Sequence, residues 1–320
     1  MLDADKQLPN FFVVGAPKAG TTSLYHYLGQ HPEVYMSPIK EPNYFASEIR
    51  PENVGEDLQK RIRRDMDALR IYLKGPMADR RFGGMVLDWE DYLKLFKNVK
   101  EELAIGEASV VYLWSKSAAE NIRFKIPGAK IVTILRHPSE RALSQYLHGV
   151  TNGVIRESFH QHIHTAPRGG NEKFSLRYPF LELGLYYEQV KRYLKIFPKE
   201  NLHILFFEDY QQQPARSLQG LFRFLNVDPR FTPNVSERQL AAQIPRAIAI
   251  AHFLKKYGVW QHLKKLSPRA FQSHLQAIAF RKRSSLVMES RDREYLRDYY
   301  REDILNLSNL LDRDLRHWLT

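Results

Sequence analysis

Short runs of consecutive hydrophobic residues alternate along the chain with longer segments in which hydrophobic residues recur every three or four positions. The three clearest runs are residues 11–14, 131–135 and 202–207, and a shorter one covers 103–107. Continuous hydrophobic runs of this length are typical of strands in a parallel sheet, because such strands are buried on both faces. The pattern therefore predicts four buried strands, of which the three clearest are inner strands of one sheet.

The segments between these runs have the hydrophobic spacing of amphipathic helices. They predict helices over residues 21–29, 56–73, 89–96, 139–147, 186–197 and 214–225, and a last helix with Leu296, Tyr300, Ile304, Leu307 and Leu311 on one face. Residues 36–45 are expected to be ordered but non-helical, and residues 151–179 to be a long surface excursion. Strands that alternate with helices predict a single α/β domain over residues 1–320, with a central parallel sheet flanked by helices.

A glycine-containing turn directly follows the first predicted strand. Gly15 and Gly20 have the spacing of the phosphate-binding loop of nucleoside triphosphatases, but Thr21 stands where that motif has its lysine, and Lys18 lies inside the turn. A helix then opens on three hydroxyl residues, Thr21, Thr22 and Ser23. This layout predicts a P-loop-like turn that binds an anion at a helix N-terminus.

A second anion pocket is predicted after the strand at 131–135. Arg136 follows this strand at the place where a nucleoside triphosphatase would have a magnesium-binding carboxylate, and Ser144 lies about two helical turns further on. Ligands of parallel sheets collect beyond the carboxyl ends of the strands, so Arg136 and the glycine turn are expected to face one crevice. An arginine and a hydroxyl that converge on one phosphate form an anion pocket without a metal.

Composition narrows the chemistry further. The chain has no cysteine, which excludes disulfides, thiolate zinc sites and cysteine nucleophiles, and its 12 histidines lack the H-E-x-x-H spacing of zinc enzymes. The polar N-terminus and the lack of any apolar stretch of roughly twenty residues lead us to expect a soluble, cytoplasmic protein. The net charge of +12 is concentrated in residues 238–288, which contain ten Lys and Arg and no Asp or Glu.

The two anion motifs resemble those of the sulfotransferases that use 3′-phosphoadenosine 5′-phosphosulfate (PAPS). Residues 17–24 are similar to that family's 5′-phosphosulfate loop, and residues 135–146 are similar to its 3′-phosphate motif. Residues 310–319 are similar to the family's closing helix and tail, so the resemblance covers essentially the whole chain. It implies an enzyme that transfers a sulfuryl group from PAPS to a hydroxyl or an amine by in-line displacement, without a metal.

Carried over by position, the resemblance assigns the residues that bind the donor. The 5′ end would be held by Lys18, Ala19, Gly20, Thr21, Thr22 and Ser23, and the 3′-phosphate by Arg136 and Ser144. Lys18 would also neutralise charge on the leaving oxygen. Tyr186 matches a family tyrosine near the adenosine, although a core aromatic explains it equally well. The basic run Arg281-Lys282-Arg283 falls near the family's basic loop over the 3′-phosphate, without the usual glycine.

A general base is expected near the sulfur, because an acceptor hydroxyl is too weak an acid to attack unaided. The segment Lys40-Glu41-Pro42-Asn43-Tyr44-Phe45 resembles the setting of the base in the glycosaminoglycan-type and bacterial members, which makes Glu41 the predicted base. The alternative interpretation of Glu41 is a surface carboxylate paired with Lys40. Glu107 is the second candidate, although Ala108 stands where glycosaminoglycan-modifying members often have a lysine. The remaining histidines considered as bases are interpreted as exposed or packing residues, namely His26, His31, His137 and His148.

The acceptor stays open between a small molecule, a lipid and a carbohydrate, and its pocket is expected in the loops around 46–85 and 151–180. The basic residues 246–283 allow three interpretations: a solvated helix face, a cover over the site, or peripheral contact with an anionic membrane. No nucleic acid is expected as a partner. Two other functions stay open, a P-loop nucleotide kinase and a non-catalytic protein that binds adenosine bisphosphate, and the oligomeric state is open as well.

Overall fold

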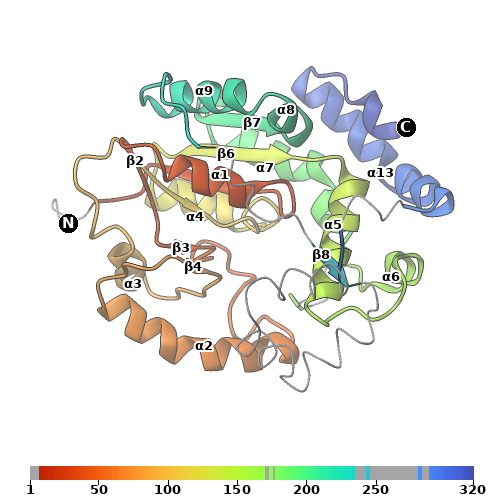
Figure 1. The fold of residues 1–320 in the computed structure, drawn as a ribbon, viewed down its shortest axis with the longest axis horizontal. Coiled ribbons are helices and arrows are strands. Elements are labelled where there is room, and N and C mark those ends of the chain that lie inside the picture. Colours follow the sequence, from red (N-terminus) through yellow and green to blue (C-terminus); the bar gives the residue numbers. More distant parts are fainter. Residues whose placement is uncertain (1–6, 170–172, 176, 235–242, 246–279, 283–287) are drawn as a thin grey trace.

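Five parallel strands form the central sheet of the computed structural model, in the order β2-β5-β1-β6-β7 (Figure 1). The structure describes all residues except 1–6, 170–172, 176, 235–242, 246–279 and 283–287. The strands are β1 (Phe11–Gly15), β2 (Val34–Met36), β5 (Ala104–Ala108), β6 (Lys130–Leu135) and β7 (Leu202–Phe206). Every residue of β1 and β5 is buried, as their hydrophobic runs predict.

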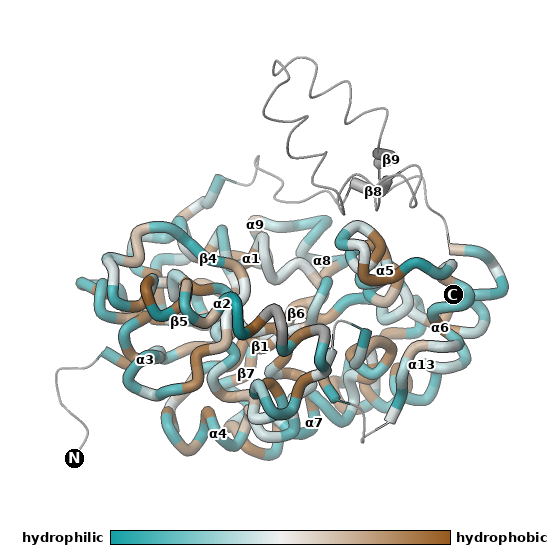
Figure 2. The backbone as a smooth tube through the Cα atoms, turned by 90° about the horizontal axis from the view of Figure 1, so that it is seen from below, coloured by the Kyte–Doolittle hydropathy of each residue, from teal (hydrophilic) through white to brown (hydrophobic). Residues whose placement is uncertain are grey.

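Helices cover both faces of this sheet (Figure 1). The α-helices are α1 (Thr21–Leu28), α2 (Glu56–Lys74), α3 (Trp89–Lys94), α4 (Ala118–Lys125), α5 (Pro138–Thr151), α6 (Phe159–Thr165), α7 (Tyr186–Ile196), α8 (Phe207–Gln212), α9 (Pro214–Leu225) and α13 (Ser290–Leu311). Three short 3-10 helices are η1 (Glu182–Gly184), η2 (Lys199–Asn201) and η4 (Arg316–Leu319). Hydrophobic and hydrophilic stretches alternate along the backbone within most of these elements (Figure 2).

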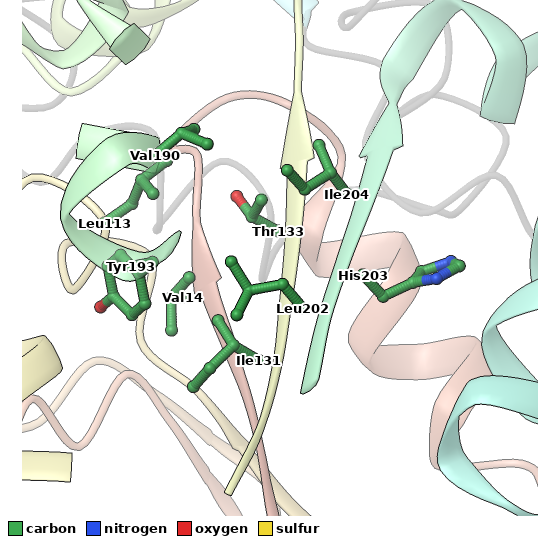
Figure 3. A pocket seen from close by; sticks show the side chains of 9 residues that line it. All are labelled: Val14, Leu113, Ile131, Thr133, Val190, Tyr193, Leu202, His203 and Ile204. Atoms are coloured by element: carbon green, nitrogen blue, oxygen red, sulfur yellow. The ribbon is translucent and has the colours of Figure 1, made fainter. Parts of the chain in front are cut away.

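The two faces of the sheet are visible around a small cavity beneath α7 (Figure 3). Side chains of α7, β1, β6 and β7 line it together with Leu113, whereas His203 of β7 points to the opposite side, where its ring stacks on Phe224 of α9 at 5.1 Å. The cavity measures about 10 Å³, which is at the lower limit for a single water molecule. It is therefore a gap in the packing between the sheet and α7 and too small for a substrate.

Two short strand pairs lie outside the central sheet. β3 (Ile39–Lys40) pairs in parallel with β4 (Arg81–Phe82), and β8 (Gln243–Pro245) pairs in antiparallel with β9 (Phe280–Lys282). The first pair fixes the chain just before Glu41. The second lies against α5.

The predicted parallel sheet flanked by helices is confirmed, but two predictions about its elements are wrong. β7 is an edge strand of the five-stranded sheet, because it pairs with β6 alone; its hydrophobic run reflects helix packing on its faces. The expected surface excursion at 151–179 contains α6, which buries His162 and Ile163. A capping box between Ser158 and Gln161 starts this helix, and the Ser-x-x-Gln spacing was a usable signal for it.

None of the helices that the structure describes is long and apolar enough to cross a membrane.

Candidate functional site

The turn between β1 and α1 leads into a helix N-terminus whose first backbone N–H groups have no side-chain cap. Gly20 has a left-handed φ of 93°, which favours glycine, and a Cβ at this position would lie 3.1 Å from the Phe207 ring, closer than an ordinary van der Waals contact. α1 starts with no side-chain cap and no acidic residue in its first turn. The N–H groups and the positive end of the dipole at Thr21, Thr22 and Ser23 are therefore placed to meet a negative charge.

The side chains of this turn differ in their accessibility. Lys18 is half-buried and has a left-handed φ of 66°, while Ala19 is fully buried. The Ser23 hydroxyl donates to the Gly20 carbonyl at 2.8 Å and accepts from the Tyr210 hydroxyl at 3.2 Å. Tyr210 and Phe207 of α8 thus brace the turn from the side, a contact that the hydrophobic run at 202–207 gave no reason to expect.

Arg136 connects the turn with the second predicted anion pocket. It follows β6, the neighbour of β1, and its Nη1 donates to the Lys18 carbonyl at 3.1 Å. Its guanidinium lies 4.7 Å over the Phe207 ring, and only 7% of the residue is exposed. α5 begins two residues later and carries Ser144, which is also buried. A buried arginine that already contacts the turn is suited to hold a second phosphate group of the same ligand.

Glu41 directly follows β3 and lies beside the carboxyl end of β5, the strand that pairs with β1 on the side opposite to β6. Its N–H donates to the Ala108 carbonyl at 2.7 Å, at the carboxyl end of β5. The Lys40 ammonium donates to Glu41 Oε1 at 2.6 Å, with side chains 3% and 33% exposed, respectively. The pairing with Lys40 is thus present, but the lysine is buried and the carboxylate remains accessible. Glu41, Lys18 and Arg136 therefore follow or flank the carboxyl ends of three adjacent strands, β5, β1 and β6.

Glu107, the second candidate base, is fully buried in β5. Its carboxylate accepts hydrogen bonds from Ser109 Oγ at 2.8 Å and from the Tyr92 hydroxyl at 3.3 Å. Burial raises the pKa of Glu107 to about 7; the hydrogen bonds of Ser109, Tyr112 and Tyr92 oppose this, and the charge of Glu41 adds to it. A carboxylate without exposed surface cannot take a proton from an acceptor directly, so the geometry favours Glu41 as the base.

The raised pKa of Glu107 predicts a pH-dependent stability. Between its unfolded pKa of 4.5 and its folded value of about 7, the folded protein binds the proton more tightly, so the free energy of unfolding falls as the pH rises through this window. Across this window the free energy of unfolding falls by roughly 3 kcal/mol. Glu107→Gln lacks this contribution, so the stability difference between wild type and variant should change by about that amount between pH 4.5 and pH 7 in urea unfolding. A difference that is constant with pH would contradict the assignment.

Tyr186 supports the site, whereas His31 packs in the core. The Tyr186 ring is fully buried, as a core aromatic would be, and its hydroxyl donates to the Arg136 carbonyl at 3.0 Å. It therefore fixes the backbone of Arg136, and a contact with adenosine stays a prediction. His31 is buried between Phe222 and Phe231, which confirms a packing role.

The predicted basic run at 281–283 is only partly described. Arg281 and Lys282 belong to β9, whose partner β8 lies against α5, the helix that carries Ser144. Arg283 and most of the segment 246–283 lie outside the described residues, so the roles proposed for them stay predictions. The described part of the chain contains no group of three or more His, Cys, Asp or Glu that could hold a metal ion.

The sequence of this chain is similar to those of known sulfotransferases. A model described as the sulfotransferase family matches residues 9–233, a range that includes Lys18, Glu41, Arg136 and Ser144. The human bifunctional heparan sulfate N-deacetylase/N-sulfotransferase 3 is 28% identical over 321 residues, covering 98% of this chain and 31% of that protein. Human carbohydrate sulfotransferase 15 is 28% identical over 284 residues, and the match covers 73% of this chain and 46% of that protein. The chain thus spans about a third to a half of the length of these curated relatives.

A solved structure agrees along the whole chain. The crystal structure of a sulfotransferase from Alicyclobacillus acidocaldarius has 28% sequence identity and a TM-score of 0.71, and the match covers 98% of this chain and 100% of that one. The strand ends that carry Lys18, Glu41 and Arg136 fall within the range matched by the family model. By sequence and by fold, this chain belongs to the sulfotransferase family.

Proposed function

We propose that this protein transfers the sulfuryl group of PAPS, the donor of its family, to a hydroxyl or amine group of a carbohydrate. The observation that carries the proposal is the placement of Glu41, Lys18 and Arg136 at the carboxyl ends of three adjacent strands. The names of the relatives, which include a heparan sulfate N-sulfotransferase and a carbohydrate sulfotransferase, support the acceptor class.

The residues present fit the donor. PAPS carries anionic groups at two positions, a 5′-phosphosulfate and a 3′-phosphate, and the site offers two sets of anion-binding groups. The uncapped N-terminus of α1 and Lys18 would hold the first, and Arg136 with Ser144 the second. The hydrogen bond from Arg136 to the Lys18 carbonyl joins the two sets, so they can bind one molecule together.

In the proposed reaction the acceptor oxygen or nitrogen forms a bond to sulfur while the bond from sulfur to the bridging oxygen of the 5′-phosphate breaks. The Glu41 carboxylate takes the proton that the acceptor loses. The Lys18 ammonium stabilises the negative charge that develops on the leaving phosphate oxygen. The products are the sulfated acceptor and 3′,5′-adenosine bisphosphate (PAP).

Calorimetry and a transfer assay test this proposal together. We expect PAP to bind without magnesium and more tightly than ATP with or without magnesium; binding of ATP that requires magnesium would support a nucleotide kinase instead. In the second assay, PAPS labelled in its sulfuryl group is incubated with an N-deacetylated heparan-type polysaccharide, a polysaccharide with hydroxyls only, and a simple phenol. Label on a polysaccharide supports the proposal. PAP binding with no transfer to any acceptor would indicate a non-catalytic binding protein.

A further inference from the structure

The segment that carries Glu41 has an unusual backbone. Glu41 and Asn43, on either side of Pro42, both have left-handed φ angles, of 69° and 58°. This region is uncommon for residues with a Cβ, and Glu41 is not one of the residue types that adopt it readily. Such conformations persist only where the surrounding structure holds them, and they cluster at functional sites.

Hydrogen bonds to the end of β5 and to Gly84 hold this segment. The Glu41 N–H donates to the Ala108 carbonyl at 2.7 Å, and the Asn43 side chain donates to the carbonyls of Glu41 at 2.9 Å and Gly84 at 3.0 Å. The Asn43 N–H donates to Ser109 Oγ at 3.1 Å. Ser109 therefore contributes a side-chain contact to the segment from the chain that follows β5.

The Ser109 hydroxyl also connects this segment to Glu107. Ser109 is fully buried, and its Oγ donates to Glu107 Oε2 at 2.8 Å while accepting from Asn43. A hydroxyl has one proton, so its donation to the carboxylate turns a lone pair toward the Asn43 N–H. Glu107 is itself held, because it is fully buried and accepts from the Tyr92 hydroxyl. The order of contacts runs from the sheet outward: Glu107, Ser109, Asn43 and then the backbone of Glu41.

We propose that Ser109 and Glu107 are positioning residues for the base, because they hold Glu41 and Asn43 in the left-handed conformations that present the Glu41 carboxylate to the acceptor. The inference rests on the proposed role of Glu41. Neither side chain needs to touch the acceptor, since both are buried. Losing the Ser109 hydroxyl frees the Asn43 N–H and lets the segment relax, which moves the carboxylate away from the attacking atom. Small misplacements of a reacting group are costly in rate.

The chain offers a closely matched control. Ser115 is also fully buried, and its hydroxyl also links a carboxylate to the backbone: it donates to Glu48 Oε2 at 2.6 Å and accepts from the Ala118 N–H at 3.0 Å. Ser115→Ala therefore removes the same chemistry from the fold without touching the Glu41 segment. The test compares Ser109→Ala, Glu107→Gln and Ser115→Ala in the full chain. It measures kcat for transfer from PAPS, the Kd for PAP, the thermal unfolding midpoint and hydrogen exchange of the Asn43 amide.

We expect Ser109→Ala and Glu107→Gln to lower kcat by about tenfold or more with the Kd for PAP within about twofold, and to speed exchange of the Asn43 amide. Ser115→Ala should lower the unfolding midpoint to a similar extent as Ser109→Ala while leaving kcat and this exchange rate near wild type. If Ser109→Ala and Ser115→Ala had equal effects on kcat and on the Asn43 amide, the positioning role would be wrong. If the wild type transferred no sulfuryl group, the proposed function would fall, and the exchange rates would still decide whether Ser109 and Glu107 hold the segment.

Discussion

Glu41→Gln is expected to lower kcat for sulfuryl transfer by about 10²–10⁴-fold, with the Kd for PAP nearly unchanged. The amide keeps the shape of the side chain but cannot take the proton that the acceptor loses. In this variant the buried Lys40 ammonium loses the charged carboxylate of Glu41 and keeps only a neutral hydrogen-bond acceptor. A lower unfolding temperature should therefore accompany the loss of activity. Steady-state kinetics with a saturating acceptor, calorimetry with PAP and thermal unfolding measure the three effects separately.

Glu188→Gln is the control for the Glu41 substitution. Glu188 also pairs with a nearby lysine, Lys191, at 3.1 Å, but it lies on the exposed surface of α7. Its substitution should leave kcat and the unfolding temperature near wild type, because exposed ion pairs contribute little. Full turnover by Glu41→Gln with the same acceptor would show that Glu41 is not the base.

Lys18→Ala is expected to lower kcat by about 10²–10³-fold, the usual loss when one group that stabilises a developing negative charge is removed. The substitution leaves the backbone requirement unchanged, since lysine and alanine meet the same steric cost at the left-handed φ of 66°. The effect therefore reports on the ammonium group. Lys18→Arg should recover little of the rate, because a planar guanidinium does not replace a compact, mobile ammonium.

Rates and PAP affinities of both Lys18 variants, measured beside Lys94→Ala, separate this role from a general effect of charge. Lys94 is an exposed lysine of α3 that pairs with Asp91 at 2.6 Å, away from the β1 turn. A kcat for Lys18→Ala within about threefold of the Lys94→Ala value would rule out a role of Lys18 in stabilising the leaving group.

The site itself was predictable to the extent that its signals are local. Gly20 is recognisable because a turn with left-handed φ before a helix requires glycine at a fixed spacing, and Arg136 because it directly follows a hydrophobic strand. The location of Glu41 came from a resemblance in a short segment, and its pairing with Lys40 was anticipated. The burial of Lys40 could not be predicted, because burial depends on residues that are distant in sequence.

The sequence by itself determined four of the five strands of the central sheet, most helices and the glycine-containing turn between β1 and α1, since hydrophobic periodicity and turn chemistry act between residues close together in the chain. Only the tertiary structure decided the order of the strands, the edge position of β7, and the contact of Arg136 with the Lys18 carbonyl. It also decided that Glu107 is fully buried, where its carboxylate accepts from the Tyr92 hydroxyl. These features arise from packing between segments that are far apart in the chain. No local sequence pattern determines which distant side chains will bury a carboxylate or form hydrogen bonds with it.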